Sequence, residues 1–155
     1  FDFSDRYYHT PAWFAGRRGG QRLAPTPEGL AGAKIGVARA GPYEAYLRTF
    51  FRDSAVVPFE SAELARDALS QGQIDLVFDD GIGLSFWVNG TLSRECCEMK
   101  GGPFVEPKFF GDGIGIVVPK RDAQLKGLIN QALKRVRESG RYDELLLRYF
   151  PNRIY

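Results

Sequence analysis

Histidine and cysteine, which supply most protein metal ligands and many catalytic groups, are scarce in this sequence. Its 155 residues include one histidine, His9, and two adjacent cysteines, Cys96 and Cys97. A structural zinc site needs about four separated ligands, so we expect no metal site and no cofactor. A single histidine in an aromatic stretch is more typical of a structural position than of a catalytic one, and we expect no catalytic residue.

The two neighbouring cysteines leave two possibilities open. A disulfide between adjacent residues is strained, yet it forms in an oxidising compartment. We expect instead that Cys96 and Cys97 are unpaired, partly buried thiols.

Long apolar runs and phosphate-binding loops are missing as well. No apolar stretch approaches the roughly 18 residues of a membrane-spanning helix, and no GxxxxGK[ST] motif occurs. The formal net charge is only +2. Residues 119–155 hold nine Lys or Arg against four Asp or Glu. Because no DNA- or RNA-binding motif accompanies them, we interpret these charges as a solvated helix face and expect no nucleic-acid partner.

Short strands alternate with helices through the middle of the chain. Apolar strands are predicted at 34–38, 55–59 and 74–78, and Pro58 places the second of them near a sheet edge. Between them, apolar residues from Tyr43 to Phe51 recur with helical spacing after Pro42, and Ser61 is placed to cap a second helix. This β-α-β-α-β order predicts an α/β fold with a parallel sheet and right-handed crossovers.

The last third of the chain is predicted to be mostly helical. A short helix at 82–88 is expected to bury Phe86 and Trp87, and a strand is expected at 113–118. Asp122 then caps an amphipathic helix that ends at Gly140, and a second helix follows until Pro151. Both helices have wide apolar faces.

Two loops are the best candidates for a ligand site. In a parallel sheet, ligands bind beyond the carboxyl ends of the strands, which selects 39–43 and 79–81. The first loop opens a helix, where free N–H groups attract anions, and the second supplies carboxylates that attract a cation. Opposite poles this close suit a zwitterion such as an α-amino acid. Equally open is a structural interpretation, in which Gly41 eases a turn and Asp80 caps the next helix.

An ordered set of segments resembles the bacterial family-3 periplasmic solute-binding proteins, which capture polar amino acids for ABC importers. The segments are DFSDRYY, TPEGLAGAKIGV, GQIDLVFDD, FFGDGIGIVVPK and LINQALKRVRESGRYDELLLRYFP. The resemblance implies a periplasmic-binding-protein type II-like fold, with two α/β lobes closing like a hinged clamp. One complete parallel-sheet lobe would span 18–101. A partial lobe with the two hinge crossings would span 1–17 and 102–155, and the crossings would lie near 13–17 and 102–109.

The resemblance also implies roles for individual residues. Asp80 would hold the α-ammonium group of the ligand, and Ala38, Gly41, Pro42 and Tyr43 would hold its carboxylate. The family commonly has Gly-Thr-Thr where this chain has Ala40-Gly41-Pro42. Both hydroxyls are therefore absent and Pro42 has no N–H, which predicts weak affinity or an unusual ligand.

Because Phe1 already lies inside the matching region, we expect an N-terminally truncated relative. The family's ligand-gripping arginine and aromatic platform would fall before Phe1. We expect a periplasmic, non-catalytic amino-acid receptor for an ABC permease, and a homo-oligomer, with a domain-swapped dimer as one form. The alternatives are a non-binding relative that acts as an oligomeric interaction protein and, less favoured, a dehydratase on the same fold.

Overall fold

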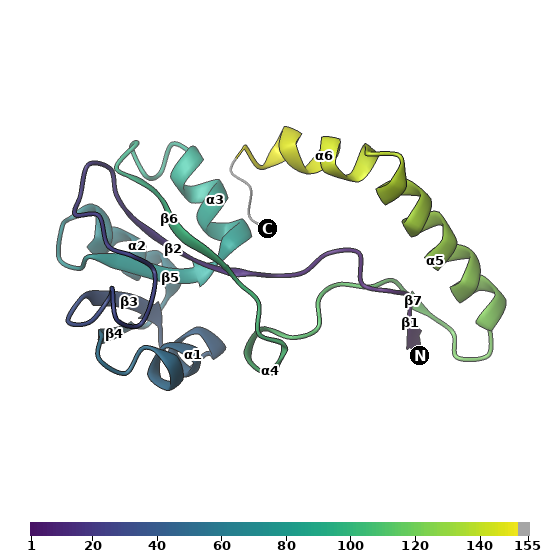
Figure 1. The fold of residues 1–155 in the computed structure, drawn as a ribbon, viewed down its shortest axis with the longest axis horizontal. Helices are drawn as coiled ribbons and strands as arrows, with labels where there is room; N and C mark the ends of the chain where they lie inside the picture. The colour runs from purple at the N-terminus through teal and green to yellow at the C-terminus, as the bar shows by residue number, and fades with distance from the viewer. Residues whose placement is uncertain (152–155) are drawn as a thin grey trace.

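The chain folds into a sheet-containing body and an extended arm (Figure 1). This computed structural model describes residues 1–151. We use "lobe" for residues 12–104, which contain a five-stranded sheet and three helices. We use "arm" for residues 1–11 and 105–151, which contain a two-stranded ribbon and the helices α5 (Ala123–Glu138) and α6 (Arg141–Tyr149).

Three strands of the lobe are parallel, as the sequence predicts. β3 (Lys34–Ala38) lies between β4 (Ala55–Phe59) and β5 (Leu76–Asp80) and is parallel to both. β4 is the edge strand, which explains how Pro58 is tolerated there. The third strand begins two residues later than predicted, so Asp79 and Asp80 are its last two residues rather than a loop.

The sheet as a whole is mixed, with two further strands joined by antiparallel pairing to the three parallel ones. β2 (Ala12–Arg17) is antiparallel to β5, and β6 (Cys97–Phe104) is antiparallel to β2. The chain enters the lobe through β2 and leaves it through β6. Neither strand is joined to its neighbour by a helical crossover, so the parallel geometry is not imposed on them.

Helices cover both faces of this sheet. α1 (Pro42–Phe50) packs with Phe14, Phe51 and Phe78 on one face. α2 (Ala62–Ser70) and α3 (Gly81–Asn89) pack on the other with Leu69 and Trp87. The predicted start of α1 at Pro42 and the Ser61 cap of α2 are both confirmed.

Phe86 and its sequence neighbour Trp87 differ in burial. Trp87 is buried, but Phe86 is 57% exposed, so the prediction that both are buried is wrong for Phe86. Adjacent helical residues face about 100° apart, and only Trp87 faces the sheet. The Phe86 ring instead meets Phe150 of the arm at a centroid distance of 5.2 Å.

A cluster of aromatic rings joins α1 to the chain that leaves the lobe. That chain continues from β6 into a single helical turn, α4 (Pro107–Phe110). Phe110 stacks on Tyr43 at 5.3 Å and meets Tyr46 at 5.1 Å, and Phe109 meets Tyr46 at 5.5 Å. α4 is therefore packed against the lobe by its rings.

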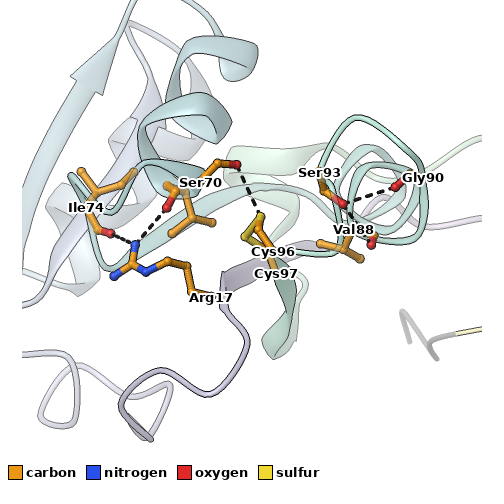
Figure 2. Close-up of a disulfide and its surroundings, with 9 residues drawn as sticks. Arg17, Ser70, Ile74, Val88, Gly90, Ser93, Cys96 and Cys97 are labelled. Atoms are coloured by element: carbon orange, nitrogen blue, oxygen red, sulfur yellow. Dashed lines mark hydrogen bonds between the residues drawn. A yellow bond between two sulfur atoms is a disulfide. The ribbon is translucent and has the colours of Figure 1, made fainter.

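Cys96 and Cys97 form a disulfide at the start of β6 (Figure 2). The expectation of unpaired thiols is therefore wrong. Cys97 is buried in the core and Cys96 lies 3.4 Å from the hydroxyl of Ser70 at the end of α2. Arg17 joins the same region, because its guanidinium donates to the carbonyls of Leu69 and Ile74. The first and last strands of the lobe are thus tied to the end of α2.

The arm has little core of its own. β1 (Asp2–Phe3) pairs with β7 (Val117–Val118), and Tyr8 forms a single bridge with Ile114. The strand predicted at 113–118 is therefore much shorter. Its glycines and the lack of a longer partner strand within residues 1–151 limit the ladder. Asp122 caps α5 as predicted, through the N–H of Leu125.

No residue of α5 or α6 is buried within the described chain. Several apolar side chains of the two helices are more than a third exposed, namely Leu125, Leu128, Val136, Leu145, Leu147 and Tyr149. The predicted wide apolar faces are confirmed. The two helices themselves lie outside the five-stranded sheet (Figure 1).

Candidate functional site

The candidate site lies where β3 and β5 end. Because these strands are parallel neighbours, the loop after Ala38 and the end of β5 at Asp80 meet at one edge of the sheet. The structure therefore brings together the five residues predicted for the site: Ala38, Gly41, Pro42, Tyr43 and Asp80. α1 begins on the β3 side of this edge and α3 begins on the β5 side.

The start of α1 leaves few donors for an anion. Gly41 is the N-cap residue and makes no side-chain cap within the described chain, and Pro42 occupies the first turn. The N–H of Ala40 donates to Oε1 of Glu44 at 2.8 Å, and Oε2 of Glu44 pairs with Arg48 at 2.7 Å. The bond from Ala40, followed by the Arg48 pair, lowers the pKa of Glu44. Glu44 thus holds a negative charge against this loop, an arrangement that the sequence did not predict.

The two carboxylate oxygens of Asp80 have different surroundings. Its Oδ2 accepts the N–H of Gly83 at 2.9 Å and so caps α3. Its Oδ1 is buried and has no hydrogen-bond partner within residues 1–151. A buried acceptor without a partner is costly. Asp80 therefore caps a helix with one oxygen and keeps the other buried without a partner among the described residues.

Asp79 belongs to an ion pair that sequence analysis missed. Its Oδ2 lies 2.9 Å from Nη2 of Arg66 on α2, and both side chains are about 15% exposed. Burial raises the pKa of Asp79, against the lowering effects of the Asp80 N–H and Arg66. No local signal predicts this pair, because the two residues are thirteen positions apart and meet only after α2 packs on the sheet.

Tyr43 links the anionic edge to the aromatic cluster. Its ring stacks on Phe110 and lies 6.1 Å from Phe78. Burial raises the pKa of the Tyr43 phenol, and the charges of Asp80 and then Asp79 raise it further. The phenol stays neutral at physiological pH, so Tyr43 adds a polar group without adding charge.

Other chemistries find little support in the described residues. No group of three His, Cys, Asp or Glu side chains comes together to hold a metal in residues 1–151. His9 lies in the arm, where its imidazole is close to the backbone of Gly113. Along the same residues, no helix combines the length and apolar character needed to cross a bilayer.

Comparison with known proteins gives a consistent family. The profile of the bacterial extracellular solute-binding proteins, family 3, matches residues 1–152. An L-arginine-binding protein of Pseudomonas aeruginosa is 33% identical over 99% of this chain and 60% of its own length. A lysine/arginine/ornithine-binding periplasmic protein of Escherichia coli is 28% identical over 99% of this chain and 59% of its own length. The chain thus spans about 60% of the length of these relatives.

Solved structures support the same fold. Substrate-binding domain 2 of GlnP from Lactococcus lactis, in an open conformation, superposes with a TM-score of 0.78 at 19% identity, over 97% of this chain and 62% of that one. A periplasmic binding protein of Salmonella typhimurium with high arginine specificity superposes with a TM-score of 0.59 at 25% identity, over 96% of this chain and 64% of that one.

Proposed function

The chain belongs to the bacterial extracellular solute-binding proteins of family 3, and on that premise we propose that it binds an α-amino acid for an ABC importer. In this proposal the protein acts in the periplasm, delivers the amino acid to an ABC permease and performs no catalysis. The two-lobed division expected from the sequence, 18–101 against 1–17 and 102–155, remains part of the proposal.

One observation carries the proposal, the open oxygen of Asp80. A buried carboxylate oxygen without a partner favours a charged donor, because such a hydrogen bond is about twice as strong as a neutral one. The α-ammonium group of an amino acid is a donor of this kind. The raised pKa of the Tyr43 phenol keeps it neutral, so it adds no further negative charge near this carboxylate.

The carboxylate of the ligand is assigned to the start of α1, next to Ala38, Gly41, Pro42 and Tyr43. Helix N-termini attract anions through their unpaired N–H groups. Here Ala40 already donates to Glu44, and Pro42 has no N–H. The N–H groups of Gly41, Tyr43 and Glu44 are left, and the charge of Glu44 opposes a second carboxylate. We therefore infer modest affinity, in agreement with the absence of the family's two hydroxyls.

The choice of amino acid is proposed from the relatives. The curated relatives reported above are named for arginine or for lysine, arginine and ornithine. Basic amino acids are thus the first ligands to test, followed by histidine, glutamine and glutamate.

A thermal-shift screen of the purified chain tests the proposal. A ligand at a hundredfold excess over its Kd stabilises the folded state by about 2.7 kcal/mol. We expect a basic amino acid to raise the Tm of the wild type and to have no effect on Asp80→Asn, which keeps the shape but loses the charge. Glu28→Gln is the matched control, because Glu28 is an exposed acid in the loop before β3. If no amino acid shifts the wild type, the chain alone is not a receptor.

A second candidate, an oligomeric interaction protein that binds no ligand, is favoured by the exposed apolar faces of α5 and α6. The same screen separates the two candidates when it is combined with a measurement of mass in solution.

A further inference from the structure

Two buried polar atoms without partners belong to side chains that meet at the start of α3. Within residues 1–151 these are Oδ1 of Asp80 and Nε of Arg66. Oδ1 of Asp80 is a hydrogen-bond acceptor on an anion, and Nε of Arg66 is a hydrogen-bond donor on a cation, so the two atoms are complementary. They nevertheless do not bind each other, and the reason is the intervening Asp79.

The guanidinium of Arg66 is within reach of Asp80. A Cβ added at Gly83 would lie 3.0 Å from Nη2 of Arg66 and 3.5 Å from Oδ2 of Asp80. The two side chains therefore flank the same point at the start of α3.

Asp79 is what holds the guanidinium away. Its Oδ2 binds Nη2 of Arg66 at 2.9 Å, and both side chains are largely shielded from water. The charged groups around this point are Arg66 from α2, Asp79 and Asp80 from β5, with the Tyr43 phenol from α1. One cation thus faces two carboxylates, and it is bound to Asp79.

We propose that Asp79 is a positioning residue that binds Arg66 and thereby keeps Oδ1 of Asp80 open for an ammonium group. Without Asp79, Arg66 is a buried cation with no partner, which is strongly unfavourable. It relieves this cost by moving onto Asp80 and occupying the oxygen that the ligand needs. This inference rests on the proposed function, since it concerns the same ammonium subsite.

A double-substitution experiment tests the inference. Asp79→Asn removes the charge that holds Arg66, and we expect it to weaken binding of the amino acid roughly 10- to 100-fold, the scale of one hydrogen bond to a charged group. Asp79→Asn combined with Arg66→Gln removes the competing cation, and we expect binding to recover to within a few fold of the wild type. Asp67→Asn, on the exposed side of α2, is the matched control. Affinities are measured by calorimetry with the basic amino acids.

A merely structural role for Asp79 predicts the opposite pattern, because a second substitution in a damaged site would not restore binding. Full binding by Asp79→Asn, or no recovery in the double variant, overturns the inference.

A second readout needs no ligand. The carboxyl carbon of Asp80 has an NMR chemical shift that responds to a new charged hydrogen bond. We expect this shift to change in Asp79→Asn and to return in the double variant. If the wild type binds no amino acid, the proposed function fails, and the NMR result still decides whether Asp79 keeps Arg66 off Asp80. An unchanged Asp80 signal in Asp79→Asn overturns the inference.

Discussion

At the scale of single residues, the end of β5 holds more charge than a buried edge normally tolerates. Asp79 and Asp80 are adjacent carboxylates, and Arg66 is the cation bound to one of them. Burial opposes ionisation of Asp79 more strongly than Arg66 favours it, which is why its pKa is raised. The protein keeps this unfavourable charge next to the oxygen proposed to bind the ligand.

The raised pKa of Asp79 predicts a pH dependence of stability. A carboxyl whose pKa is higher in the folded state stabilises the fold fully below its ordinary value of 3.8 and loses that contribution as the pH rises through the folded-state pKa. We therefore expect the stability of the wild type, relative to Asp79→Asn, to fall as the pH rises through this window. Urea denaturation of both proteins at a series of pH values measures the difference.

Comparison of the two proteins removes the contributions of carboxyl groups away from the end of β5. The pKa values of Asp2, Glu44 and Glu98 are lowered, chiefly by hydrogen bonds, and act in the opposite direction in both proteins. A stability difference that is constant with pH would show that Asp79 titrates alike in the folded and unfolded chain.

Asp80 and Gly41 were predicted as site residues from the sequence because ligands bind beyond the ends of parallel strands, and these ends can be located from the local sequence. It could not identify the partner of Asp79, since a helix and a strand must first pack before Arg66 arrives. The sequence also did not indicate that Glu44 would occupy the N–H of Ala40, because that contact depends on the left-handed backbone of Ala40, with φ of 58°.

At the scale of elements, α4 fixes the path of the chain where it leaves the lobe. Four residues long, it is too short to be stable alone, and it is held by aromatic packing against α1. Phe110 contacts Tyr43, Tyr46 and Phe78. The same Tyr43 lies at the candidate site, so the exit of the chain and the site share one side chain.

Removal of the Phe110 ring is expected to destabilise the lobe. Phe110→Ala should lower the free energy of unfolding by about 2 kcal/mol, less than a fully buried phenylalanine because the ring is only half buried. Chemical denaturation followed by tryptophan fluorescence measures the loss. Phe1→Ala is the control, since Phe1 is 88% exposed and its removal should change little. Equal losses in the two variants would mean that the ring cluster adds no stability.

Helix boundaries were the most predictable elements. Ser61 and Asp122 cap their helices through bonds to residues three positions away, which are local signals. The antiparallel attachment of β2 and β6 was not predictable in the same way, because nothing within either segment states which strand it will join. The pairing of Cys96 with Cys97 was also missed, since adjacency alone does not reveal the backbone geometry at that point.

At the scale of the whole molecule, the arm is less well buried than the lobe. Its ribbon has two residues in each strand, and an isolated two-stranded pair is marginal in water. Side-chain contacts attach α5 to the N-terminal segment, where Lys126 pairs with Asp2 at 3.0 Å and Asn130 accepts the N–H of Asp5. Leu128 and Leu147 remain 58% and 51% exposed. The resemblance found in the sequence predicted the family correctly. How far the apolar faces of α5 and α6 are exposed could not be predicted, because it depends on which surfaces pack against them.

Self-association is the expected consequence of that exposure. Exposed apolar patches larger than a few hundred Å² are typical of interaction surfaces. We expect the mass measured by light scattering to exceed that of one chain and to increase with concentration. Leu128→Glu together with Leu147→Glu should shift the protein toward a single chain, while Gln131→Glu, also exposed on α5, should not. A stable single chain of wild type at all concentrations would contradict the prediction.

The pairing of Ala12 with Phe104 has an evolutionary consequence. The first and last residues of the lobe lie side by side, so the chain enters and leaves the lobe at one place (Figure 1). The two segments that flank the lobe therefore begin next to each other. Domains with adjacent ends are the ones that tolerate transfer between proteins. The lobe, with the ammonium subsite proposed in it, can therefore be exchanged as one unit, separately from the segments that flank it.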